Sequence, residues 1–175
     1  MNESSAKLMV AVCDQVVFIK IRGRGDFNLS LDLKKLFDEL RQRGYLRFVL
    51  ELCDCQMMDS TFLGLLSGVA LKFREAGALQ GSSLELINPK PCIEEVLENL
   101  GVLHLFKIIH SEKTVEVNYQ PLAQTADKSK TEVTRNCLEA HRTLMGLDPK
   151  NVQKFKDVAQ FLADDLKRLE LVEKK

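Results

Sequence analysis

The sequence predicts an α/β fold, in which helices pack on a mixed, largely parallel sheet and a helical hairpin extends the C-terminus. Short segments rich in β-branched residues alternate with segments of helical periodicity between residues 8 and 109. Such alternation is typical of right-handed crossovers between parallel strands. Hydrophobic residues form 45% of the 175-residue chain, which supports a packed core and argues against disorder.

The first part of the chain predicts a β-hairpin followed by a helix. Residues Leu8–Arg22 are rich in β-branched side chains, and Asp14-Gln15 suits the turn between two strands. The hairpin is expected to end at Gly23–Asp26, because glycine and aspartate favour turns. We expect the helix to begin at Ser30 as its N-cap and to end at Gly44.

The middle of the chain continues with a strand and a long helix. Leu46–Leu52 is mostly apolar, as in a central strand covered by helices. The next helix is expected over Asp59–Ala76, with Gly77 as its end. Glycine inside a helix costs about 1 kcal/mol. Gly64 and Gly68 share one side of this helix, and we expect them to allow its close approach to the sheet.

Two further strands and a helix complete the predicted α/β pattern. The strands are expected at Ser83–Asn88 and Leu105–Ile109, and a helix between them begins at Pro91 and ends at Gly101. The predicted order is therefore β-β-α-β-α-β-α-β. Alternating apolar residues over 115–119 allow one more short strand.

Composition then changes, which divides the chain into an α/β domain over 1–120, a polar linker over 121–130 and a helical hairpin over 131–175. The first helix is expected to end at Gly146, and Asp148-Pro149 starts the second as N-cap and first helical residue. The apolar residues of the second helix have the 3,4 spacing of a coiled-coil seam. They are Val152, Phe155, Ala159, Leu162, Leu166 and Leu169.

Charge and composition argue against several classes of function. The 25 basic and 25 acidic residues leave no broad positive field for nucleic-acid binding. Neither a signal peptide nor an apolar membrane span is evident, so we expect a cytoplasmic protein without a membrane partner. The five cysteines suggest no disulfide framework, and Cys53 and Cys55 are expected to be small buried side chains on one strand. No residue pattern indicates a metal site, a cofactor or a catalytic group, so we expect no enzyme.

A helix start at Asp59-Ser60-Thr61 is the most informative local feature. It follows a strand, and sites gather at that edge of an open α/β sheet. Free N–H groups at a helix start stabilise an anion, and a phosphate on Ser60 would add close to two negative charges there. A docking partner would then meet new charge and bulk. The same three residues also form an ordinary capping sequence.

The segment Asp59–Leu66 resembles the D-S-[ST]-G-hydrophobic-G-hydrophobic-hydrophobic motif of STAS domains in anti-sigma factor antagonists. Gly23–Asp26 is similar to the family's turn after its second strand, and the order of elements agrees over Met9–His110. The resemblance implies a STAS-like fold and phosphorylation at Ser60. It also implies a set of partner-binding residues. These are Asp26, Asp59, Ser60, Thr61 and Phe62.

Two positions depart from the family pattern. Phe62 replaces the first glycine of the motif, and Gly25 stands where an aliphatic residue is usual. Phe62 either contacts a partner beside Ser60 or folds into the core. The C-terminal helical pair also lies outside the family pattern.

The resemblance implies partner switching. The unphosphorylated antagonist binds an anti-sigma factor, usually also its serine kinase, and so releases the sigma factor to act in transcription. Phosphorylation of Ser60 ends this binding, and a PP2C-type phosphatase restores it. The alternative is a non-phosphorylated STAS scaffold or oligomerisation module that acts through its C-terminal helices, for example as a homodimer.

Overall fold

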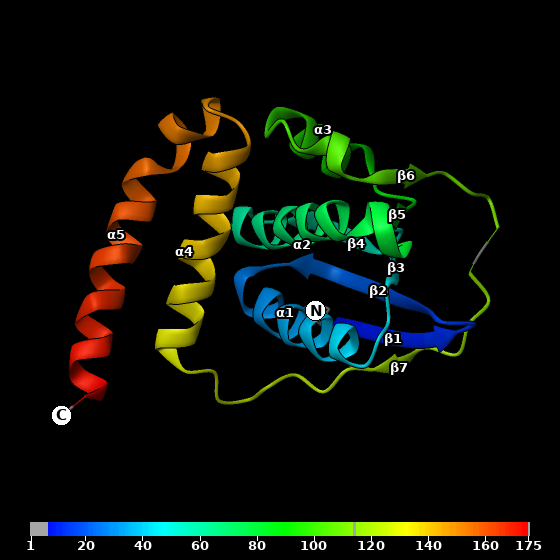
Figure 1. Ribbon diagram of the computed structural model, residues 1–175, viewed down its shortest axis with the longest axis horizontal. Helices are drawn as coiled ribbons and strands as arrows, with labels where there is room; N and C mark the ends of the chain where they lie inside the picture. The colour runs from blue at the N-terminus through cyan, green and yellow to red at the C-terminus, as the bar shows by residue number, and fades with distance from the viewer. Residues whose placement is uncertain (1–6, 114, 175) are drawn as a thin grey trace, which may run out of the picture.

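The computed structural model describes residues 7–113 and 115–174, arranged as a sheet with helices against it and a helical pair beside them (Figure 1). Within these residues, no helix combines the length and apolar character that a membrane span requires. The elements are β1 (Lys7–Cys13), β2 (Val16–Gly25), α1 (Phe27–Gln42), β3 (Arg47–Glu51), β4 (Cys55–Met58), α2 (Ser60–Gln80), β5 (Ser83–Ile87), α3 (Pro91–Asn99), the 3-10 helix η1 (Leu103–Leu105), β6 (Lys107–Ile109), β7 (Gln120–Pro121), α4 (Lys130–Leu147) and α5 (Lys150–Glu173).

The sheet has the strand order β6-β5-β3-β2-β1-β7. Neighbouring strands from β6 to β2 are parallel, whereas β1 and β7 are antiparallel to their neighbours. The short strand β4 pairs in parallel with the end of β2, which brings the starts of α1 and α2 together. The predicted α/β class with a largely parallel sheet is therefore confirmed.

The core lies between this sheet and helices α1 and α2. Ile19 and Ile21 of β2 alternate with more exposed residues, as expected for a strand with one fully buried face. Phe48 of β3 packs between Phe37 of α1 and Phe73 of α2, with ring centroids 5.1 and 5.3 Å away. These three rings tie both helices to the same face of the sheet.

Several predicted boundaries were wrong. Asp26, rather than Ser30, caps α1, because its carboxylate already accepts hydrogen bonds from two N–H groups of the first turn. Ser30 is instead buried inside the helix and donates to the carbonyl of Phe27. Helix α2 continues past Gly77 to Gln80, and Gly81, with φ of +68°, follows it.

Other differences concern short elements. Strand β4 was not predicted, and Cys53 lies in the turn before it, half-buried, while Cys55 begins it and is buried. The two cysteines therefore do not share a strand as expected. The extra strand expected over 115–119 lies instead at β7, and α4 ends after Gly146 rather than at it.

The C-terminal helices form the predicted hairpin, and α4 lies against α2 and α1 while α5 packs on the outer side of α4 (Figure 1). Asn151 at the start of α5 is fully buried and donates to the carbonyls of Leu100 and Leu144, both at 2.9 Å. Leu144 joins the main core cluster. One end of the hairpin is thereby fixed to the end of α3.

A polar network lies on the face of the sheet that is turned away from α1 and α2. Glu51 is almost fully buried and accepts hydrogen bonds from Lys20 at 2.9 Å, Tyr119 at 2.7 Å and Cys53 at 3.0 Å. Burial alone would raise the pKa of Glu51, but the hydrogen bonds from Cys53, Lys20 and Tyr119 outweigh it, so the pKa is lowered.

We expect Tyr119→Phe to reduce the free energy of unfolding by about 1–2 kcal/mol at pH 7, because a hydrogen bond to a buried carboxylate is lost. A lowered folded-state pKa gives stability that is present above the unfolded pKa of Glu51 and lost as pH falls through the folded one. The difference between wild type and variant should thus shrink below about pH 4. Urea unfolding across pH measures it, and Tyr45→Phe, which changes a hydroxyl without a hydrogen bond among the described residues, should show no such trend.

Candidate functional site

The starts of α1 and α2 meet at one corner, where Asp59 connects them. Its Oδ1 accepts a hydrogen bond from the backbone N of Phe62, and its Oδ2 accepts one from the backbone N of Phe27, both at 2.8 Å. Its own N–H donates to the carbonyl of Gly25 at 2.9 Å. Both carboxylate oxygens are therefore used to hold the corner together.

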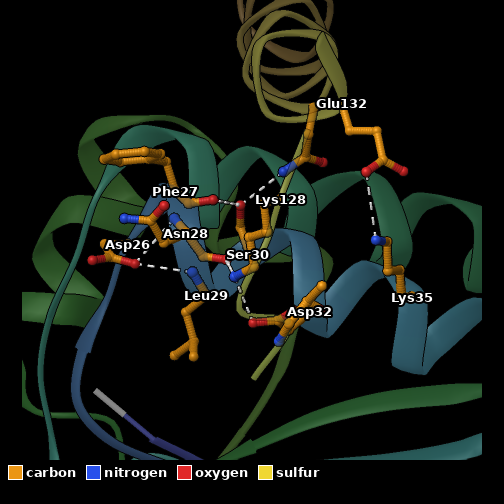
Figure 2. A network of polar contacts seen from close by, with 11 residues as sticks. Asp26, Phe27, Asn28, Leu29, Ser30, Asp32, Lys35, Lys128 and Glu132 are labelled. Carbon is orange, nitrogen blue, oxygen red and sulfur yellow. Dashed lines mark hydrogen bonds and ion pairs between the residues drawn. The ribbon is translucent and has the colours of Figure 1, made fainter. Parts of the chain in front are cut away.

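Asp26 is used in a similar way on α1. Its Oδ1 accepts hydrogen bonds from the N–H groups of Asn28 at 3.1 Å and Leu29 at 2.9 Å (Figure 2). Two of the five residues predicted to bind a partner thus act as helix caps, whose loss typically costs about 1 kcal/mol.

Phe62 folds into the core and is fully buried, so its side chain is not a surface for a partner. Gly25 lies directly opposite: a Cβ at Gly25 would sit 3.0 Å from Cδ1 of Phe62 and 3.1 Å from Cγ of Met58. The two departures from the family pattern therefore compensate each other in volume, because the missing side chain at Gly25 makes room for the ring of Phe62.

Ser60 is the first residue of α2, but it is half-buried rather than freely exposed. Its hydroxyl lies 2.9 Å from Nε2 of His141, which belongs to α4 and is itself 6% exposed. Nδ1 of His141 lies 2.7 Å from the carbonyl of Cys137, which can only accept a hydrogen bond. In the neutral imidazole, Nδ1 therefore carries the proton, and the Ser60 hydroxyl donates to Nε2.

Thr61 faces α4, as Ser60 does, and is buried. Burial raises the pKa of the Cys137 thiol, and a hydrogen bond with the Thr61 side chain offsets part of that rise. Ser60 and Thr61 thus contact two residues of α4 that are one turn apart, His141 and Cys137.

The close approach predicted for Gly64 is real, but its partner is α4 and not the sheet. A Cβ at Gly64 would lie 2.7 Å from the carbonyl carbon and 2.8 Å from the Cα of Ala140, distances that only movement of backbone could relieve. Gly68 is one turn further along, and a Cβ there would be 3.6 Å from Cγ2 of Thr143, an ordinary contact. Only Gly64 is required for the crossing.

The linker and α4 are also bound to α1 by polar groups (Figure 2). Nζ of Lys128 lies 2.6 Å from Oδ2 of the buried Asp32 and also donates to the carbonyl of Asn28. The buried side chain of Asn136 donates to the Ser30 hydroxyl at 2.8 Å. Two ion pairs, Lys34–Glu139 and Lys35–Glu132, extend the contact along α1.

Ser60 is predictable from the sequence, but His141 and Ala140, which complete the site, are not. They lie about 80 residues away in a segment outside the family pattern, so no local motif connects them to Ser60. The one usable signal is the spacing of Gly64 and Gly68, since small residues four apart on a helix often mark a close helix crossing.

A family model and a solved structure agree with this fold. The family model of the STAS domain matches residues 7–115, so α4 and α5 lie outside the match. A candidate anti-sigma factor antagonist from Thermotoga maritima is similar, with a TM-score of 0.52 and 24% identity over 61% of this chain and 86% of that one. SpoIIAA from Bacillus in its phosphorylated form has a TM-score of 0.48 and 21% identity over 61% of this chain and 93% of that one. No curated protein sequence matches the chain.

A double-mutant cycle with Ser60→Ala and His141→Phe should give a coupling energy of about 1 kcal/mol in the free energy of unfolding. Phenylalanine keeps an aromatic ring beside Phe155, whose centroid is 5.1 Å from that of His141. It removes the acceptor of the Ser60 hydroxyl and also the Nδ1 donor to the Cys137 carbonyl, but the second loss is the same with and without Ser60→Ala and cancels in the cycle. The matched cycle of Ser67→Ala with His141→Phe should give a value near zero, because Ser67 donates to Leu63 within its own helix. Equal coupling in both cycles would contradict the Ser60–His141 hydrogen bond.

Proposed function

Because the chain belongs to the STAS domain family, we propose that it is a non-enzymatic, cytoplasmic signalling module of the anti-sigma factor antagonist type. It binds an anti-sigma factor that has serine kinase activity and thereby regulates transcription. Phosphorylation of Ser60 switches this binding off, and a PP2C-type phosphatase reverses it. The observation that carries the proposal is the position of Ser60 as the first residue of α2, at the corner where β4 ends.

The electrostatics of this corner supports a switch. Asp59 lies beside Ser60, so a phosphate would bring close to two further negative charges to a site that already holds a carboxylate. The phosphate would also remove the hydroxyl proton that is donated to His141. Both changes act on any partner surface placed against the start of α2, with no rearrangement of the core.

We expect peptide mapping of the protein from its own organism, with phosphatase inhibitors present, to find phosphate on Ser60. In a binding assay with an anti-sigma factor kinase of that organism, Ser60→Asp should weaken affinity at least tenfold, because it introduces charge at the contact. Ser60→Asn introduces a neutral side chain of the same size as aspartate, so it is the matched control and should lose less. An unmodified Ser60 under all growth and stress conditions, with equal binding by both variants, would contradict the proposal.

A second candidate function is self-association through the C-terminal helices, which the outer surface of α5 favours. Val158, Phe161, Leu171 and Val172 are exposed by 39%, 64%, 65% and 73%. In the first half of α5, residues 150–161, three lysines outnumber Asp157, and in the second half, residues 162–173, four acidic residues outnumber Lys167 and Arg168. An antiparallel pair of α5 helices would place opposite charges together and the two Phe161 rings near the centre.

If α5 pairs in this way, the wild-type chain should sediment as a dimer, and Phe161→Glu should shift it to the monomer by placing a charge in the apolar contact. Gln160→Glu adds the same charge at a neighbouring exposed position and should leave the dimer in place. A monomeric wild-type chain at tens of micromolar would rule out this second function.

A further inference from the structure

We propose that α4 is a releasable cover for the Ser60 corner, so that the chain exchanges between a closed form, in which α4 occupies the partner surface, and an open form that presents it. This inference deepens the proposed function and rests on it for its purpose. The occupant of the surface is a segment of the same chain, residues 130–147, and the surface is the outer side of α2 and α1 at their N-terminal ends.

The closed form blocks chemistry at Ser60. For transfer from ATP, a bond forms between Oγ of Ser60 and the γ-phosphorus, the bond from that phosphorus to the β–γ bridging oxygen breaks, and the hydroxyl proton leaves with a base of the kinase. An attacking Oγ needs free space in line with the phosphorus. In the closed form, the imidazole of His141 lies 2.9 Å from Oγ, and α4 continues past it on both sides.

The polar contacts between the linker or α4 and the domain suit release, whereas Leu144, which is buried in the main core, favours the closed form. The Ser60–His141, Asn136–Ser30 and Lys128–Asp32 pairs all join a polar group of the linker or α4 to one of the domain. On opening, each group can exchange its partner for water, so the net cost of breaking each is modest. The ion pairs of Lys34 and Lys35 are partly exposed, so they contribute little to the free-energy difference between the closed and open forms.

Phosphorylation and covering are then coupled in both directions. A phosphate on Ser60 needs the space that His141 holds, so it favours the open form. By linkage, whatever favours the closed form must weaken access to Ser60 by the same factor. A substitution at the α2–α4 crossing can therefore change the balance between the closed and open forms without altering Ser60 or His141.

Gly64 is the position for such a substitution. Gly64→Ala places a methyl group against the backbone of Ala140 and should push α4 away, while alanine in place of glycine favours helix α2 itself. Gly68→Ala gives the same gain in helix propensity with only an ordinary contact to Thr143, so it is the matched control. The two variants differ in one respect, which is whether α4 can remain packed against α2.

Access to position 60 is measured in the full chain carrying Ser60→Cys, by timed alkylation with a small maleimide and peptide mapping. With Gly64→Ala added, the introduced thiol should react at least tenfold faster than with Gly68→Ala added. Two native cysteines serve as internal references: the exposed Cys92 should react at one rate throughout, and the buried Cys55 should stay slow, which shows that the core remains folded.

Two results would overturn the cover. One is an introduced thiol at position 60 that reacts as fast as Cys92 without any glycine substitution. The other is a thiol that reacts equally in the two glycine variants while Cys55 stays protected.

If Cys55 becomes reactive in the Gly64→Ala chain, a disulfide between Gly68→Cys and Thr143→Cys decides the matter instead. Oxidation should slow alkylation of the thiol at position 60, and reduction should restore it; an unchanged rate would overturn the cover. None of these readouts involves a kinase. Failure of the cover is therefore distinct from failure of the proposed function, which is decided by phosphate on Ser60.

Discussion

The backbone contact between Gly64 and Ala140 determines how the side chains of α4 meet the start of α2. Two helices can approach to this distance only where one of them has no side chain. Ser60 lies one turn before Gly64 on α2, and His141 directly follows Ala140 on α4, so the crossing itself places the imidazole over the hydroxyl. Cys137, one turn earlier on α4, reaches Thr61 for the same reason.

Attachment of α4 has a firm end and a weaker end. Near the turn to α5, Leu144 is buried in the main core and Asn151 is bound to two carbonyls, so separation there would expose apolar surface and leave buried groups unpaired. Toward the start of α4, contacts to α1 are polar and several are exposed. Separation of α4 from the domain therefore requires the least free energy when it begins at the linker and the end near α3 acts as the hinge.

The sequence predicted the α/β class, the long helices and Ser60 at a helix start, because these depend on local periodicity and capping. It did not predict β4, whose four residues pair only with the end of β2 and have no alternation of their own. Ser30 matches the pattern of an N-cap because a serine before an apolar run has the same local sequence whether Asp26 precedes it or not. Phe62 and Gly25 each looked anomalous alone, and only their contact in space shows that one explains the other.

Covering a site with part of the same chain changes what an affinity measurement means. An external partner competes with α4 for one surface, so its apparent dissociation constant is the intrinsic one divided by the fraction of open chains. If the closed form outnumbers the open form about 99 to 1, the partner binds about a hundredfold more weakly than to an uncovered domain. Residues of α4 thereby set the partner concentration at which the module responds, although they do not contact the partner themselves. A single hydrogen bond of about 1 kcal/mol, such as that of Ser60 to His141, shifts that concentration about fivefold.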